Sequence, residues 1–443
     1  MQFRCLLGVA SLAAFHLSAA TTLAQASGVP TLSIALAASR VQFVASELEV
    51  GKQSVVQFST NLVDWMEILS LKPTTSTFNW SDTKQGAAGF YRLIQDPGPQ
   101  KLVAASIYQV MKGNAIQGLS ITVVTNGGLA WAQGFGRLAK GRPELVDTNT
   151  LFQAASISKP ASALAALRMV EQGLLSLDEP VNNKLTTLLI PGKNGASVTL
   201  RHILSHTGGI PDGVAFYDVG SPIPTLLQIL KGQPPSRTGR IVASDPLGVP
   251  AYSNAGYTFL QALMIDVSGK AFPDLLRELV FEPLEMHSST FEQPLPEDLQ
   301  SNAACGHVGG AVIKGNWYVL PQMAPAGLWT TPSDLARMFI AVRSAYLAEA
   351  GSLIRQDTAR EMLRLHAAAI FGRPYGLGFG LVLKDGAAVG FGHLGSLPGY
   401  VCGALTFVES GDGVVIMTNS DPSIISNVYN SCATAYGWPG GLL

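Results

Sequence analysis

The sequence has few charged residues and no excess of either sign. Only 13% of its 443 residues are charged, against about 25% in an ordinary soluble domain. A disordered chain needs many charges and few apolar residues, whereas 47% of this chain is hydrophobic. Lys and Arg together number 29, and Asp and Glu number 30. This balance gives no basic surplus to neutralise a phosphate backbone, so we do not expect nucleic acid as a partner.

Several common catalytic and cofactor motifs are also missing. The sequence has no phosphate-binding loop and no dinucleotide fingerprint, so we expect no cofactor. It has no Gly-x-Ser-x-Gly elbow, which argues against an α/β-hydrolase triad. His202 and His206 are four residues apart, but Ile203 stands where a zinc peptidase has glutamate. We therefore expect no metal site.

The first 26 residues have the features of a secretory signal peptide. Arg4 supplies a positive charge, an apolar stretch follows from Cys5 to about Ala20, and Ala24-Gln25-Ala26 is a small-residue cleavage site. The alternative is a membrane anchor, but His16 and Ser18 interrupt a short apolar core. We expect a periplasmic or secreted protein with no transmembrane anchor after signal removal.

Cysteines are scarce, and three remain after the predicted cleavage. Cys305, Cys402 and Cys432 lie too far apart in sequence for a clustered zinc site. They allow one disulfide and one free thiol. We expect the pair Cys402–Cys432, because a C-terminal strand and the helix predicted to cover its sheet carry these two residues. The alternative is three buried thiols that act as small apolar residues.

Residues 27–95 are predicted to form a small β-sandwich-like module. Short β-type runs recur about every ten residues, at positions 31–36, 40–44, 54–58, 66–69, 77–80 and 90–94. The aromatic residues expected in its core are Trp65, Phe78, Trp80, Phe90 and Tyr91. The module could be a spacer, a surface-attachment module or a carbohydrate-binding module. Residues 96–100, rich in Pro and Gly, are predicted to be a stiff linker.

From residue 101 onward the pattern changes to a mixture of helices and strands. Residues 103–111 are helical in character, and Asn126-Gly127-Gly128 joins two strands in a hairpin. Residues 156–365 are mostly helical, and a strand pair precedes a final helix over 424–436. Strands at both ends with helices between them predict an α/β (α+β) domain over 101–443, with one sheet and a helical insertion.

The first candidate for chemistry is Ser156-Ile157-Ser158-Lys159, at the start of a predicted helix that ends near Gln172. A spacing of three residues places Ser156 and Lys159 on one face of the helix. A buried lysine loses its proton more easily, and a lysine of this kind can activate a serine nucleophile. The motif alone is weak, since Ser81-Asp82-Thr83-Lys84 also fits it in the β module, where we expect no helix.

Two further motifs follow in the second half of the chain. Tyr252-Ser253-Asn254 precedes an apolar helix. Tyr252 could relay a proton and Asn254 could bind the substrate, or Asn254 could be only a helix cap. His393-Leu394-Gly395-Ser396 lies at the edge of the C-terminal strands, where the alternative is a turn with a surface histidine.

These three motifs, in this order, resemble those of the serine β-lactamase and penicillin-binding protein superfamily, specifically its class C β-lactamase-like branch. The resemblance extends over residues 101–443. It includes the segments 173–181, 198–209, 283–286 and 330–336. The resemblance implies an antiparallel sheet flanked by helices, packed against a mainly helical region, with the site between them. It implies a small-molecule or peptide substrate.

The resemblance also implies roles for single residues. Ser156 would be the nucleophile, and Lys159 and Tyr252 would handle protons. The implied substrate contacts are Asn254, His393, Gly395 and Ser396. Backbone N–H groups of Ser156 and Ser396 would form the oxyanion hole.

The third motif departs from the Lys-Thr-Gly of many members of the superfamily. An ammonium there would hold a substrate carboxylate, whereas a histidine with a pKa near ~6.5 is mostly neutral at pH 7. We expect His393 to gain charge toward pH 6. The departure argues more against β-lactamase activity than against hydrolase activity. We therefore expect an exported serine hydrolase that forms an acyl-enzyme on an ester, amide or β-lactam carbonyl. The alternative is a catalytically weak penicillin- or peptide-binding sensor.

Overall fold

The structure, a computed structural model, describes residues 7–9, 31–37, 40–46, 48–61, 64–83 and 89–443. Its packing divides the chain into two compact units. The first consists of residues 1–115 and 426–441, and the second of residues 116–425 and 442–443. The predicted signal peptide lies outside the described residues, apart from Leu7–Val9, which forms strand β1.

The first unit contains two antiparallel sheets, as expected for the small all-β module. One has the strand order β1-β7-β4-β5 and the other β2-β3-β6. The strands after β1 are β2 (Thr31–Ala37), β3 (Arg40–Ser46), β4 (Ser54–Ser59), β5 (Met66–Leu71), β6 (Phe78–Thr83) and β7 (Gly89–Gln95). Each predicted run corresponds to one of these strands. In β3, Phe43 and Ala45 are buried while Gln42 and Val44 are exposed, the period of two that a half-buried strand requires.

The core of this module is more aliphatic than we predicted. Tyr91 is buried between Phe43 and Phe58. Most of the other core residues are aliphatic, among them Leu32, Val56, Ile68 and Leu93. Trp65 is not a core residue, since its ring is half-buried beneath the guanidinium of Arg92, 4.0 Å from the ring centroid. Phe90 is also only half-buried, and Phe78 and Trp80 pack against the core from its margin.

Two helices complete the first unit. Helix α1 (Pro99–Asn114) begins within the expected linker, because Pro99 occupies the first helical turn, where a missing N–H has no cost. Helix α10 (Ile425–Tyr436) follows the last strand of the chain. The hydroxyls of Ser106 on α1 and Ser431 on α10 form a hydrogen bond of 2.6 Å. The domain boundaries at residues 95 and 101 stay predictions.

The second unit is built on an eight-stranded sheet in which all neighbouring strands are antiparallel. In spatial order the strands are β16 (Ala367–Ile370), β17 (Arg373–Tyr375), β18 (Gly380–Lys384), β19 (Ala387–Leu397), β20 (Tyr400–Phe407), β21 (Gly413–Thr418), β8 (Gly118–Thr125) and β9 (Gly128–Gly136). The predicted hairpin joins β8 and β9, with Asn126 and Gly127 at φ 53° and 75°. Val415 of β21 lies opposite Thr122 of β8, which joins the two ends of the domain in one sheet.

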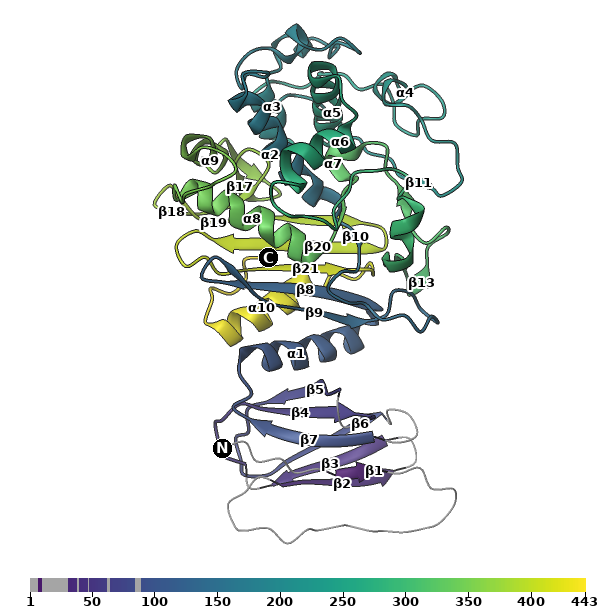
Figure 1. Cartoon of the computed structure of the whole chain (residues 1–443), viewed down its shortest axis with the longest axis vertical. Helices are drawn as coiled ribbons and strands as arrows, with labels where there is room; N and C mark the ends of the chain where they lie inside the picture. Colours follow the sequence, from purple (N-terminus) through teal and green to yellow (C-terminus); the bar gives the residue numbers. More distant parts are fainter. Residues whose placement is uncertain (1–6, 10–30, 38–39, 47, 62–63, 84–88) are drawn as a thin grey trace. The chain divides into compact units, whose positions relative to one another are not determined.

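Helices cover this sheet and form the insertion that we predicted. The main ones are α2 (Ser158–Glu171), α3 (Leu200–Leu204), α4 (Leu226–Lys231), α5 (Asn254–Ser268), α6 (Phe272–Leu276), α7 (Met323–Ala326), α8 (Pro332–Tyr346) and α9 (Gln356–Met362). Helix α8 packs on strands β8, β20 and β21 (Figure 1). The predicted fold class is thereby confirmed. No helix in the described part of the chain combines the length and hydropathy needed to cross a membrane.

The expected Cys402–Cys432 disulfide is wrong. Both thiols are free and buried, as is that of Cys305. Cys402 Sγ donates a hydrogen bond to the carbonyl oxygen of Ala154, 3.0 Å away. Its neighbour Gly403 faces Ile425, the first residue of α10. Side chains alternate along a strand, so Cys402 faces away from that residue.

Candidate active site

A short irregular segment positions Ser156 at the start of α2. Residues Ala155–Ile157 form one 3₁₀ turn that leads directly into the helix. Ala155 has a φ of 46°, in the left-handed region, where a residue with a side chain is strained by about 1–3 kcal/mol. A Cβ at Gly395 of β19 would overlap the carbonyl oxygen of Ala154. Glycine in the third motif therefore lets β19 approach the segment that carries Ser156.

Lys159 is fully buried and donates three hydrogen bonds. Its Nζ lies 3.1 Å from Ser156 Oγ, 2.7 Å from Asn254 Oδ1 and 2.9 Å from the carbonyl oxygen of Pro325. Burial lowers the pKa of the Lys159 amine to about 7, although the negative charge of Asp212 acts in the opposite direction. The amine is therefore partly neutral at neutral pH.

The partners of this amine fix the direction of its lone pair. Asn254 Oδ1 and the Pro325 carbonyl can only accept hydrogen bonds, so they hold two N–H groups in either protonation state. The orientation of the Asn254 amide is set by Asp212, whose Oδ1 accepts from Asn254 Nδ2 at 2.9 Å. When the amine is neutral, its lone pair is therefore directed at Ser156 Oγ. This geometry suits a general base.

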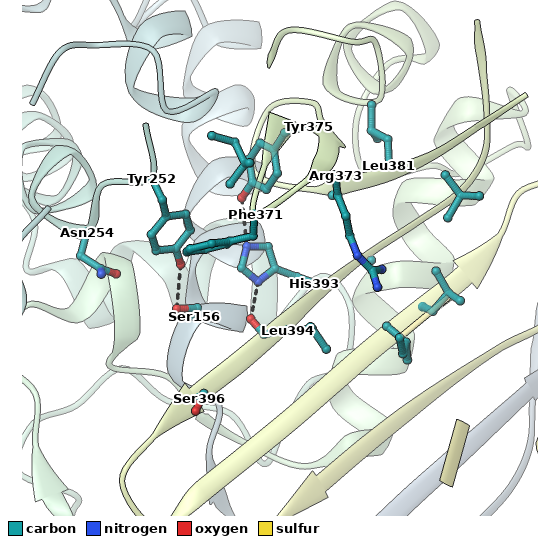
Figure 2. A pocket seen from close by; sticks show the side chains of 16 residues that line it. Ser156, Tyr252, Asn254, Phe371, Arg373, Tyr375, Leu381, His393, Leu394 and Ser396 are labelled. Atoms are coloured by element: carbon teal, nitrogen blue, oxygen red, sulfur yellow. Dashed lines mark hydrogen bonds between the residues drawn. The ribbon is translucent and has the colours of Figure 1, made fainter. Parts of the chain in front are cut away.

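Tyr252 contacts the same serine from the other side. Its hydroxyl donates to Ser156 Oγ at 2.8 Å (Figure 2). Burial raises the pKa of the Tyr252 phenol above its ordinary value, so the phenol keeps its proton at neutral pH. Lys159 Nζ lies 4.6 Å from the centre of the Tyr252 ring. The ring of His206 packs behind Tyr252, with 4.4 Å between ring centres.

Asn254 is not the helix cap that we considered as its alternative role. Ser253 caps α5, because its side chain accepts from the N–H of Gly256 at 2.9 Å. The Asn254 side chain lines the cavity and contacts Lys159 and Asp212. Sequence reasoning missed Asp212. Its only sequence signal is its position three residues after the segment 198–209 that resembles the superfamily.

The third motif places a neutral histidine in the site. His393 Nδ1 lies 2.6 Å from the Leu394 carbonyl oxygen, and Nε2 lies 2.9 Å from the Tyr375 hydroxyl. A carbonyl only accepts, so Nδ1 carries the proton and Nε2 accepts from Tyr375. Burial, together with the nearby charge of Lys159, lowers the pKa of the His393 imidazole to about 3. The expectation that His393 gains charge toward pH 6 is therefore wrong, and so is the alternative of a surface histidine.

These residues border a cavity of about 560 Å³. Its lining includes five of the predicted site residues: Ser156, Tyr252, Asn254, His393 and Ser396. Lys159 lies buried beside Ser156, and Gly395 packs against Ala154. Most of the remaining lining residues are apolar. Sequence reasoning missed Phe371 and Arg373, since no motif marks them and they lie about twenty residues before His393 (Figure 2).

The other candidate motifs are not assembled in this way. Ser81 is exposed on strand β6 and Lys84 lies outside the described residues, so the second Ser-x-x-Lys match has no helical turn at its serine. His202 Nδ1 accepts from the N–H of Thr199, and His206 Nδ1 accepts from the N–H of Ser253. Among the described residues, no group of three or more His, Cys, Asp or Glu side chains is placed to hold a metal ion.

Comparisons with known proteins identify the family of this chain. A family model described as Beta-lactamase matches residues 103–430. Penicillin-binding protein 4* of Bacillus subtilis is 25% identical over 311 residues, which cover 65% of this chain and 64% of that protein. The match therefore spans less than two thirds of that relative. Esterase EstB of Burkholderia gladioli is 28% identical over 381 residues, which cover 73% of this chain and 93% of the esterase.

Solved structures extend the likeness to the fold. A penicillin-binding protein homologue from Pyrococcus abyssi, described as octameric, has a TM-score of 0.61 and 24% identity. The alignment covers 76% of this chain and 77% of that one. A penicillin-binding protein from Bacillus halodurans has a TM-score of 0.58 at 21% identity, covering 75% of this chain and 98% of that one. At these identities the likeness concerns the fold alone.

Proposed function

The chain belongs to the β-lactamase family, within the serine β-lactamase and penicillin-binding protein superfamily, and on that premise we propose that it is a serine hydrolase with Ser156 as nucleophile. The observation that carries the proposal is the arrangement around Ser156 Oγ. A buried amine with a lowered pKa lies 3.1 Å away, and a protonated phenol lies 2.8 Å away. These are the groups that a serine needs in order to lose its proton and pass one to a leaving group.

In the proposed acylation step, Ser156 Oγ attacks the carbonyl carbon while neutral Lys159 takes its proton. Backbone N–H groups of Ser156 and Ser396 stabilise the oxyanion, an effect of about 10²–10³-fold for one such donor. Tyr252 gives its proton to the leaving group, and the Lys159 ammonium beside its ring stabilises the resulting phenolate. The products of this step are the acyl-enzyme and the protonated leaving group.

Hydrolysis of the acyl-enzyme reverses these transfers. Water adds to the acyl carbon and gives a proton to the Tyr252 phenolate. Ser156 Oγ then leaves and recovers its proton from Lys159. The carboxylic acid is released, and all three side chains return to their starting states.

The surroundings of Ser156 favour uncharged acyl groups. His393 stands where many relatives of the superfamily carry a lysine, and it remains neutral because burial lowers its pKa to about 3. Nothing at this position can hold a carboxylate next to the scissile bond by charge. We therefore propose esters as the preferred substrates, ahead of β-lactams and D-amino-acid peptides. Membership of the class C branch, export, and a role for the β module remain predictions from the sequence.

Covalent labelling tests the nucleophile. The wild type should gain the mass of a fluorophosphonate probe, and Ser156→Ala should not. Ser81→Ala is the matched control, because Ser81 belongs to the other Ser-x-x-Lys match, and it should label like the wild type. Full labelling of Ser156→Ala in intact-mass spectra would contradict the assignment.

A substrate panel tests the reaction class. It contains a p-nitrophenyl ester, a chromogenic cephalosporin and a D-amino-acid peptide, each assayed with the wild type and Ser156→Ala. We expect the highest kcat/KM on the ester and its loss in the variant. Labelling of Ser156 without turnover of any substrate would instead support the penicillin- or peptide-binding sensor.

A further inference from the structure

A two-residue turn between β16 and β17 carries an aromatic side chain at the rim of the cavity. Phe371 and Gly372 occupy the turn, with φ angles of 49° and 77°. Turns with two positive φ angles favour Asn, Asp and Gly, and a bulky residue at positive φ is a conformational outlier. Phe371 is also 80% exposed, more than any other large hydrophobic residue among those the structure describes. Folding alone therefore gives no reason for phenylalanine at this position.

The position of the ring relates it to the reaction site. The Phe371 ring lies 4.7 Å from that of Tyr252, between ring centres, with an angle of 46° between their planes. Figure 2 shows Phe371 lying across the cavity, in the same region as Tyr252 and His393. Phe371 and Ser156 line the same cavity. A group attached to Ser156 could thus contact the ring.

Most of the other residues that line the cavity are apolar. They include Ile370, Leu381, Val382, Leu394, Leu405 and Leu443. Leu394 is partly exposed and follows His393 directly on β19. The cavity volume of about 560 Å³ lies within the range of ~300–1,000 Å³ typical of small-molecule sites. The cavity that Ser156 lines can therefore hold an apolar group of several carbon atoms.

Among the described residues, the cavity has a charged side chain only on the side of His393 that lies away from Ser156. Of the lining residues that the structure describes, Arg373 is the one with a Lys, Arg, Asp or Glu side chain. Arg373 donates a hydrogen bond to the carbonyl oxygen of Leu442, and in Figure 2 it lies on the opposite side of His393 from Ser156. Among the described lining residues, none between Phe371 and Ser156 has a charged side chain, and the partly protonated amine of Lys159 lies buried beside the serine.

We infer that Phe371 is a specificity-determining residue, and that its ring forms one wall of a subsite for an apolar acyl chain. This inference rests on the proposed function and names its substrate class as esters of medium-length aliphatic or aromatic acids. A bound acyl chain removes the exposed ring from water, which stabilises the complex by the hydrophobic effect. The strained turn holds the ring over the cavity before the substrate arrives. Strained and exposed side chains of this kind are found where binding needs them.

The test compares a short and a longer ester in Phe371→Asn. Asparagine suits the positive φ of the turn but cannot pack against an acyl chain. The ratio of kcat/KM for p-nitrophenyl hexanoate to that for the acetate should fall about tenfold, mainly through a higher KM. The same substitution should raise the melting temperature, because the strain of a bulky residue at positive φ is relieved. Phe371→Trp should retain a high ratio.

Leu145→Asn provides the matched control. Leu145 is 65% exposed and does not line the cavity, so this variant loses a similar amount of exposed apolar surface without affecting the ratio. If the ratio does not change in Phe371→Asn, the inference is wrong. Equal losses of kcat/KM on both esters would then show that the ring only supports Tyr252.

A second measurement separates this inference from the proposed function. Rates of covalent labelling by a short-chain and a long-chain alkyl fluorophosphonate report the same subsite without any need for turnover. The preference for the long chain should fall about tenfold in Phe371→Asn, and equal preferences in both proteins would overturn the inference. Retention of ester hydrolysis or labelling in Ser156→Ala would instead contradict the proposed function. Failure of the inference and failure of the proposed function therefore give different experimental results.

Discussion

The two sides of the cavity differ in how their side chains are held. On one side, Lys159 and Tyr252 are buried, and both donate hydrogen bonds to Ser156 Oγ. On the other, Phe371 is largely exposed on a strained turn, and Arg373 is exposed beside it. The first side has the fixed distances of about 3 Å and the shifted pKa values that the proposed proton transfer requires. The second has the exposed surface that the inferred contact with an acyl chain requires.

The two sides also lower the stability of the fold in different ways. A buried amine and a strained Ala155 destabilise the fold at the first side, and the strained turn at Phe371 destabilises it at the second. Sites of this kind gain activity at the expense of stability. Substitutions at both sides should therefore increase stability, but only those at the first side should abolish the chemistry. Phe371→Asn tests the second side.

The largest effect is expected where the buried amine is removed. Lys159→Met should lower kcat/KM by about 10³-fold or more, because Ser156 loses its base. It should also raise the free energy of unfolding at and below neutral pH, because the cost of burying a cation is removed, although the hydrogen bonds lost at Asn254 and Pro325 reduce this gain. Ester hydrolysis and denaturant unfolding measure the two effects.

The gain in stability should depend on pH in a defined direction. The pKa of Lys159 is about 7 in the folded protein and near 10.5 when unfolded. Between these values the unfolded chain binds more protons, so the wild type gains stability from this group as the pH rises. The advantage of Lys159→Met should therefore be largest below pH 7 and smaller near pH 10. An advantage that grows with pH would contradict the lowered pKa.

A smaller loss is expected when the proton donor on the same side is removed. Tyr252→Phe keeps the ring between His206 and Phe371 but loses the hydroxyl that contacts Ser156 Oγ. The value of kcat/KM should fall about 10²-fold, within the range for loss of one acid–base group. The fall should be greater for esters with poor leaving groups, such as alkyl esters, than for p-nitrophenyl esters. Equal losses on both would argue that the hydroxyl only orients the serine.

The smallest effects concern charge on the second side. His393 stays neutral from pH 8 to pH 6, since its pKa is about 3. The ratio of kcat/KM for an ester with a distal carboxylate to that for its neutral analogue should therefore be constant over this range. Arg373→Gln should lower the ratio only a few-fold, because an exposed ion pair is weak. A ratio that rises toward pH 6 would show that His393 does gain charge.

The sequence predicts the parts of this protein that follow from local spacing. The six predicted strands of the β module correspond to β2–β7, because alternation and turn residues are local signals. The hairpin at Asn126-Gly127 and the helix after Ser156 are predicted for the same reason. The Ser156–Lys159 pair lies within one turn, and the resemblance to a family adds Tyr252 and Asn254, whose separation in sequence is large.

Features that depend on burial or on facing direction could not be predicted in this way. The disulfide prediction failed because strand alternation turns Cys402 toward Ala154. The charge of His393 was misjudged because its pKa depends on burial and on the nearby charge of Lys159. Phe371 lies close to Tyr252 only through the sheet and its hairpin, and no sequence spacing reveals this approach. The chemistry of the site is thus more visible in the sequence than its specificity.

The rate of Ser156 labelling as a function of pH tests the central claim most directly, namely that a neutral buried Lys159 activates this serine. The labelling rate by a neutral alkyl fluorophosphonate, followed by intact-mass spectrometry from pH 5 to pH 9, should rise about tenfold per pH unit and level off near pH 7. In Asp212→Asn the plateau should begin at a lower pH, because the charge that raises the pKa of Lys159 is removed. A rate that does not change with pH, or that is still rising at pH 9, would contradict the account.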